Sequence, residues 1–385
     1  MCRSQILHSA VTACLAIATL FVAQRVQAAS APTPQINILY SFGGPGGAPE
    51  TGVIADAGGT LYGTAVGGGP AGWGSVFALT PGQQGYTEKD LYDFCKDKTC
   101  SDGARPLGGL TLGKDGSLYG VAAIGGKGGC GGSGCGLVFR LKPGKSGYKE
   151  IVLYKFTGGA DGGMPFWTPV LQHDGTIVGV TTFGSLCQLC GTVFALTPSK
   201  SGYTETTLHS FAGGNDGIIP NGVTEDKTGK IYGTTNYGGG GSGCGGEGCG
   251  ILYTLVPGNG TYTENIFHVF EGGSDGSNPS SAPTIEEKSG AIFGTAPYGG
   301  SRDFGVVYQF APSNGGYTES ILYDFLGSEG FGPWGPVLVG TGPSAYRSGQ
   351  PRCGLRPERR GSVAVRSAKP GPSRHGRRAV LQPSS

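Results

Sequence analysis

The sequence contains none of the short motifs that mark several common enzyme classes. It has no His-Glu-x-x-His zinc motif, no Gly-x-Ser-x-Gly nucleophile turn and no phosphate-binding loop. It also lacks a helical pattern of apolar residues beyond residue 30. Short runs of Val, Phe, Tyr, Leu and Thr, bounded by Gly, Pro and Asp, stand in its place. This pattern predicts an all-β fold.

Glycine is abundant, with 78 residues, but it does not follow the strict Gly-X-Y period of collagen. The glycines gather between the apolar runs, where tight turns need a residue without a Cβ atom. They therefore indicate turns between many short strands.

One hairpin is repeated along the chain. Gly191–Phe211 reads as an apolar strand, a turn containing Pro, Ser, Lys and Gly, and a second strand that ends in a Tyr-x-Glu segment and an aromatic pair. Near-copies occur at Gly74–Phe94, Gly136–Phe156, Gly250–Phe270 and Gly305–Phe325. Such regular repetition is typical of a repeat architecture.

Two further candidate strands precede each hairpin. The first candidates are Gly52–Asp56, Leu110–Asp115, Val170–Asp174 and Gly222–Asp226. The second candidates are Leu61–Thr64, Leu118–Val121, Ile177–Val180, Ile231–Thr234 and Ile292–Thr295. One unit is therefore a four-stranded antiparallel meander of about 55 residues.

Tandem four-stranded units predict a β-propeller with five complete blades and a truncated sixth, over residues 29–342. The alternating residues of Gly191–Thr197 are apolar or Thr on both faces, as expected for a blade covered on both sides. A β-solenoid-like repeat array is the alternative. Ile36–Phe42 is a lone copy of the closing strand, and we expect it to complete the last blade and cover its edge.

The two ends of the chain differ from its body. Residues 1–28 combine Arg3, the apolar run Ala10–Ala23 and the small residues Val26–Ala28, and so predict a secretory signal peptide. The run is short for a membrane span, and lipidation at Cys14 is the minor alternative. We expect a secreted or cell-envelope location, in the periplasm or at the outer surface.

Residues 343–385 break the repeat and hold nine of the 14 arginines. We interpret them as an aberrant basic tail, disordered or read in a shifted frame, with a genuine tail that binds an acidic partner as the alternative. Residues 29–342 carry 16 basic and 25 acidic residues, a net charge of −9. An acidic body disfavours nucleic acid as a partner.

Eight cysteines of the body fall into four close pairs: Cys95 and Cys100, Cys130 and Cys135, Cys187 and Cys190, and Cys244 and Cys249. An even number in an exported chain favours local disulfides. Zinc binding and a redox Cys-x-x-Cys are the alternatives that remain open.

A Gly-Gly-x-Asp-Gly element recurs between units and contains Asp161, Asp216 and Asp275. We expect a structural turn and no cofactor, with Ca²⁺ bound by these carboxylates as the alternative. Strand direction places these turns and the cysteine loops on one face, together with Trp73, Phe166 and Trp167 as candidate binding aromatics.

Each Tyr-x-Glu segment also contributes a glutamate, and this regular repetition predicts a hydrogen bond from blade to blade. The five are Glu88, Glu150, Glu205, Glu264 and Glu319. His209 and His268 replace the tyrosine of the closing strand, and we interpret them as packing variants.

The combination of Leu-Tyr-Ser-Phe (39–42), Leu/Ile-Tyr-Gly-Thr (61–64 and 231–234) and Gly-Thr-Val-Phe-Ala-Leu (191–196) resembles the GloVer tandem repeat of exported bacterial proteins. The resemblance implies a propeller-like secreted protein and supplies no catalytic residues. We therefore expect a binding or scaffold module for an unknown extracellular ligand, a polysaccharide or a protein. An extracellular propeller enzyme, a lyase or hydrolase acting on polysaccharide through carboxylates, is the alternative.

Overall fold

The structure is a computed structural model that describes residues 39–42, 49–126, 128–240, 244–328, 330–339, 362–366 and 380–384. The chain divides into two units, Met1–Pro34 and Gln35–Ser385, and every described residue belongs to the second. The predicted signal peptide and most of the predicted tail therefore lie outside the described residues.

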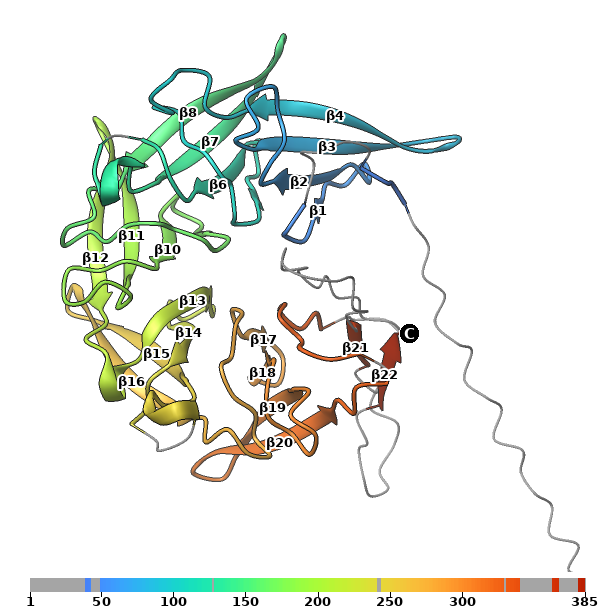
Figure 1. The fold of residues 1–385 in the computed structure, drawn as a ribbon, viewed down its shortest axis with the longest axis vertical. Coiled ribbons are helices and arrows are strands. Elements are labelled where there is room, and N and C mark those ends of the chain that lie inside the picture. The colour runs from blue at the N-terminus through green and yellow to red at the C-terminus, as the bar shows by residue number, and fades with distance from the viewer. Residues whose placement is uncertain are drawn as a thin grey trace, which may run out of the picture. The chain divides into compact units, whose positions relative to one another are not determined.

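Five four-stranded antiparallel sheets follow one another in sequence order, and we number them blades 1 to 5 (Figure 1). Blade 1 contains β1 (Ile54–Ala55), β2 (Leu61–Ala65), β3 (Ser75–Gly82) and β4 (Gly85–Asp93). Blade 2 contains β5 (Thr111–Leu112), β6 (Leu118–Ala122), β7 (Leu137–Gly144) and β8 (Gly147–Lys155). Blade 3 contains β9 (Val170–Leu171), β10 (Ile177–Thr181), β11 (Thr192–Ser199) and β12 (Gly202–Ser210).

Blade 4 contains β13 (Ile218–Glu225), β14 (Ile231–Tyr237), β15 (Ile251–Gly258) and β16 (Thr261–Val269). Blade 5 contains β17 (Thr284–Glu286), β18 (Ala291–Ala296), β19 (Val306–Ser313) and β20 (Gly316–Asp324). In the described parts of the connections lie the 3₁₀ turns η1 (Cys130–Gly132), η2 (Gly214–Asp216) and η3 (Cys244–Gly246). The all-β prediction and the four-strand unit are thus confirmed.

The first strand of blades 1, 2 and 3 is shorter than predicted, with two residues each. In blades 2 and 3, residues before the short strand accept hydrogen bonds from the preceding blade. The Thr64 hydroxyl of blade 1 donates to the carbonyl of Gly108 before β5, at 3.0 Å. The Thr111 hydroxyl of blade 2 donates to the carbonyl of Pro169 before β9, at 2.5 Å.

The packing around the second strand explains the glycine in its Leu/Ile-Tyr-Gly motif. In blade 2 the fully buried ring of Phe139 lies over Gly120, and a Cβ atom there would come within 2.5 Å of the ring. The glycine is needed because the aromatic residue of the third strand occupies the space of its side chain.

The hydrophobic core lies between the blades. The described residues form six buried clusters, and four of them join consecutive blades, from blades 1 and 2 to blades 4 and 5. We call each such boundary a junction and name it by its blades. A fifth cluster joins blade 5 to Val337 and Val339, and the sixth joins blade 1 to Tyr40 and Phe42.

Both ends of the repeat region therefore pack as parts of a further blade. The rings of Phe42 and Phe77 lie 4.9 Å apart, close to the 5.0 Å between Phe94 and Phe139 at the 1/2 junction. No strand is assigned at residues 39–42, although one was predicted over Ile36–Phe42. Residues 39–42 nevertheless pack on blade 1 in the way that a closing strand packs on the next blade.

The outermost strand of every blade contains a β-bulge. In blade 1, Val76 pairs with Tyr92 and Phe77 pairs with Asp90, so Leu91 has no partner in the ladder. The same shift occurs in the other four blades. Because side chains alternate along a strand, the extra residue places Tyr92 on the face opposite Glu88. One strand can therefore contact both neighbouring blades.

In the basic tail, β21 (Ser362–Arg366) and β22 (Val380–Ser384) pair as an antiparallel two-stranded sheet. Across the described residues, no helix has the length and apolar character needed to cross a membrane.

Candidate functional site

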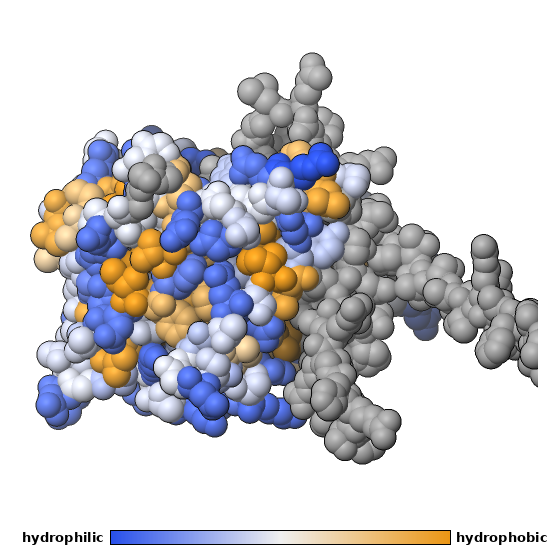
Figure 2. Space-filling model, turned by 90° about the horizontal axis from the view of Figure 1, so that it is seen from below, coloured by the Kyte–Doolittle hydropathy of each residue, from blue (hydrophilic) through white to orange (hydrophobic). Residues whose placement is uncertain are grey.

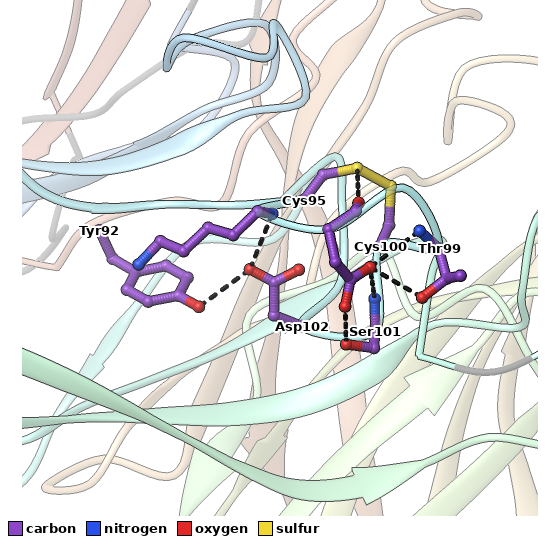
Figure 3. Close-up of a disulfide and its surroundings, with 8 residues drawn as sticks. Tyr92, Cys95, Thr99, Cys100, Ser101 and Asp102 are labelled. Atoms are coloured by element: carbon purple, nitrogen blue, oxygen red, sulfur yellow. Dashed lines mark hydrogen bonds between the residues drawn. A yellow bond between two sulfur atoms is a disulfide. The ribbon is translucent and has the colours of Figure 1, made fainter.

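Each junction between complete blades contains one group of three side chains. A Tyr or His comes from the closing strand, an Asp from the turn that follows it, and a Glu from the outermost strand of the next blade. At the 1/2 junction the Tyr92 hydroxyl lies 2.9 Å from Asp102 Oδ2 (Figure 3). It also lies 2.8 Å from Glu150 Oε2. The prediction that the repeated glutamates make a bond from blade to blade is confirmed at this junction.

The 2/3 junction keeps the tyrosine but changes the partner of the glutamate. The Tyr154 hydroxyl donates to Asp161 Oδ2 at 3.0 Å. The Thr207 hydroxyl donates to Glu205 Oε1, also at 3.0 Å. Glu205 is thus held by a residue of its own strand.

The 3/4 and 4/5 junctions carry a histidine in place of the tyrosine. His209 Nε2 lies 3.0 Å from Asp216 Oδ1 and 3.8 Å from Glu264 Oε2. His268 Nε2 lies 3.4 Å from Asp275 Oδ2 and 3.9 Å from Glu319 Oε1. These histidines were interpreted from the sequence as packing variants. They do pack edge to face against Phe211 and Phe270, but each also faces two carboxylates.

Burial alters the ionisation of these groups. Removal from water raises the pKa of Glu150 to about 7, and nearby Asp102 adds to the effect. Burial likewise raises the pKa of Glu264 to about 7, although the His209 charge acts in the opposite direction. Burial opposes protonation of His209, but the hydrogen bond to Asp216 and the charge of Glu264 outweigh it and raise the pKa of the ring.

The recurring aspartates also close the turn between blades. Asp161 accepts a hydrogen bond from the Thr157 amide at 2.8 Å, and Asp216 accepts one from the Ala212 amide at 2.6 Å. Asp275 accepts one from the Glu271 amide at 2.9 Å. In each case the donor lies four residues earlier, so these calcium candidates serve as acceptors within their own turns.

A groove with a volume of about 470 Å³ lies between the outer strands of blades 4 and 5. His268 and Glu319 of the junction group line it, together with Lys230, Thr254, Asn265, Phe267 and Tyr317. The Phe267 and Tyr317 rings meet edge to face at 4.8 Å, and Tyr317 is 39% exposed. On the side of the molecule shown in Figure 2, hydrophobic residues form separate patches between polar ones.

Phe267 makes this groove different from the other junctions. It is the bulged residue of its strand, and the equivalent positions hold Leu91, Leu153, Leu208 and Leu322. The sequence analysis did not single out Phe267. The available signal was an aromatic residue at a position that is leucine in the other units.

The four expected cysteine pairs form disulfides: Cys95–Cys100, Cys130–Cys135, Cys187–Cys190 and Cys244–Cys249. Cys130 and Cys135 lie against Gly158 in the turn to the next blade. The cysteine loop and the turn therefore share one face, as expected from strand direction.

Trp73 and Phe304 occupy the position that is Cys135, Cys190 or Cys249 in the other blades, immediately before the third strand. They are 42% and 37% exposed, whereas the cysteines are buried.

The predicted binding aromatics lie in two places. Trp73 is in the loop between β2 and β3 of blade 1, and Phe166 and Trp167 are in the segment before β9. Trp167 is half-buried and packs on the core of the 3/4 junction. Of the three, Trp73 is the most exposed, so it is the most accessible to a binding partner.

Comparison with known proteins gives a family and a fold. The profile of the Gloeobacter/Verrucomicrobia repeat matches residues 26–246. No curated protein sequence matches the chain. A crystal structure provisionally assigned as a 6-phosphogluconolactonase from Bacteroides uniformis has a TM-score of 0.51 and 14% identity, covering 84% of this chain and 80% of that one. A provisionally assigned glucose dehydrogenase from Thermus thermophilus has a TM-score of 0.48 and 14% identity, covering 88% and 97%. The first likeness concerns the fold alone.

Proposed function

This chain belongs to the Gloeobacter/Verrucomicrobia repeat family, and we propose that it is an exported propeller that binds an extracellular polysaccharide in the groove between blades 4 and 5. The protein would act as a binding or scaffold module at or outside the cell envelope. Export is supported by the signal-like residues 1–28 and by four disulfides, which persist in oxidising compartments.

The observation that carries the proposal is the groove itself. It combines the rings of exposed Tyr317 and half-buried Phe267 with the polar ends of Lys230, Thr254 and Asn265. The C–H face of a sugar ring can pack on aromatic carbon while its hydroxyls bond to amide, hydroxyl and ammonium groups. Aromatic surface combined with a small number of convergent polar groups is a common composition of a small-molecule site.

Calorimetric titration of the oxidised protein with a panel of extracellular polysaccharide fragments tests this function. Phe267→Leu restores the residue of the other junctions, so the fold should be kept while Kd rises at least tenfold. Leu153→Ala, at the equivalent position of the 2/3 junction, is the matched control and should leave Kd unchanged. Equal affinity of wild type and Phe267→Leu would place the ligand elsewhere, and no binding across the panel would contradict the proposed ligand class.

The enzyme alternative has one observation in its favour. Glu319 lines the groove, and burial raises its pKa, which is the change that a general acid requires. Turnover of the bound fragment, abolished by Glu319→Gln, would favour a polysaccharide lyase or hydrolase. Binding without turnover supports the binding module.

A further inference from the structure

The two histidine junctions bring together the side chains that hold metal ions in many proteins. In each of the groups His209–Asp216–Glu264 and His268–Asp275–Glu319, one nitrogen and two carboxylate oxygens lie within 4.8 Å of one another. Zinc is held by His nitrogen and by Asp or Glu oxygen, and open zinc sites have three protein ligands with a further position for water.

The spacing of these atoms suits a small divalent ion. Ligands about 2.0–2.1 Å from a tetrahedral ion lie about 3.3 Å from one another. The nitrogen of His209 lies 3.0 and 3.8 Å from its two carboxylates, and that of His268 lies 3.4 and 3.9 Å from its own. At the 3/4 junction the two distances lie on either side of the value for a bound ion, and at the 4/5 junction both lie above it. Side-chain movements of about 0.6 Å or less would bring each histidine nitrogen and its carboxylates to this spacing.

Several of these atoms are buried without a hydrogen bond. Glu264 Oε1 at the 3/4 junction, and both His268 Nε2 and Glu319 Oε1 at the 4/5 junction, make no hydrogen bond of normal geometry among the described residues, although His268 Nε2 lies near two carboxylates. Glu150 Oε1 at the 1/2 junction is also unpartnered, but there a tyrosine hydroxyl lies within hydrogen-bond distance of both carboxylates. Leaving such atoms unpaired is costly, and a ligand that contacts all of them would remove the cost.

We propose that these two groups are binding sites for a divalent transition-metal ion, one at the 3/4 junction and one at the 4/5 junction. Two carboxylates balance the charge of the ion, and the imidazole nitrogen favours a transition metal over Ca²⁺. The ion would tie the closing strand of one blade to the outermost strand of the next. The 3/4 site is independent of polysaccharide binding, because His209, Asp216 and Glu264 do not line the groove, whereas His268 and Glu319 of the 4/5 site do.

Zinc uptake by the oxidised full chain, after treatment with a chelator and removal of the chelator, tests the proposal. Calorimetry and metal analysis should give two ions per chain. His209→Tyr and His268→Tyr place the residue of the 1/2 and 2/3 junctions at these positions, and each should reduce the uptake by one ion. The double variant should take up none, and Co²⁺ should give a visible absorption band that disappears in parallel.

Two controls separate the junction groups from other ligands. His173→Gln removes a histidine of blade 3 outside both groups and should leave two ions bound. Glu264→Gln and Glu319→Gln test each site by a change that keeps the size of the side chain, should a tyrosine variant fail to fold. Uptake that the His209 and His268 variants leave unchanged, or no uptake by the wild type, would overturn the proposal. If only one of the two histidine variants takes up fewer ions, the proposal is wrong for the other junction.

Discussion

The hydroxyl of Tyr92 in blade 1 lies 2.8 Å from Oε2 of Glu150 in blade 2, so a side-chain hydrogen bond crosses the junction. Tyr92 reaches that junction because the bulge at Leu91 turns it away from the face that carries Glu88. Its hydroxyl also lies 2.9 Å from Asp102, and one phenol proton cannot be donated to two carboxylates at once. The arrangement therefore favours a protonated form of Glu150.

Glu150→Gln should make the protein more stable at pH 8 and weaken its dependence on pH. Burial raises the pKa of Glu150 from 4.5 to about 7, so the folded state holds more protons than the unfolded state between these values. Stability contributed by this group is present below pH 4.5 and is lost as the pH rises to about 7. The gain from Gln at pH 8 should be roughly 1–3 kcal/mol.

Urea unfolding of both proteins from pH 5 to pH 8, with a chelator present, measures this difference. Glu88→Gln, on the outer strand of blade 1, is the control for a change of net charge. Parallel curves for wild type and Glu150→Gln would show that Glu150 is ionised throughout.

Replacement of the Cys130–Cys135 disulfide by two serines should lower the free energy of unfolding by roughly 2 kcal/mol, the chain-entropy value for a ring of this size. The bond also fixes sulfur atoms against Gly158 of the next turn, so hydrogen exchange should increase in both loops. Guanidinium unfolding of the oxidised proteins gives the energy. Exchange that increases only within residues 130–135 would contradict the contact between the loops.

Gly120→Ala should destabilise blade 2 by roughly 1–3 kcal/mol, because the new methyl group meets the ring of Phe139 in a closely packed core. Phe139→Leu should recover part of this loss by making room. The double variant should thus be less destabilised than the sum of the two single changes, as measured by thermal unfolding. Simple additivity would argue against the contact.

Phe94→Ala should cost roughly 3–5 kcal/mol, as expected for a fully buried ring. Phe42→Ala should cost about half as much, because Phe42 packs on Phe77 but is only half-buried. Chemical unfolding compares the two. Equal losses of unfolding free energy would mean that Phe42 is covered on both sides in solution, as in a closed ring. If Phe42→Ala caused no loss, the packing of residues 39–42 on blade 1 would be contradicted.

The repeat, the four-strand unit and the cysteine pairs could be predicted because each is local in the sequence. Hydrophobic alternation, turn residues and the spacing of Cys130 and Cys135 all report on short segments. The all-β propeller prediction followed from them, and the family match and the five sheets agree with it.

The junction groups could be predicted only in part. Glu150 was expected to bond across blades, but its partner could not be identified, because Glu88 and Tyr92 are four residues apart and a regular strand would place them on one face. Nothing in Leu91 signals a bulge, since leucine packs on either face. For the same reason His209 was taken as a packing residue, and its approach to Asp216 and Glu264 depends on register and not on local sequence.

A double-mutant cycle on Tyr92→Phe and Glu150→Gln at pH 7 tests most directly whether the outermost strand links neighbouring blades through its bulge. We predict a coupling energy of about 1 kcal/mol between Tyr92 and Glu150, typical of one hydrogen bond to a partly charged group. The same cycle on Tyr92 and Glu88, within one strand, should give a coupling near zero. Coupling of Tyr92 to Glu88 and none to Glu150 would contradict the register and the junctions built on it.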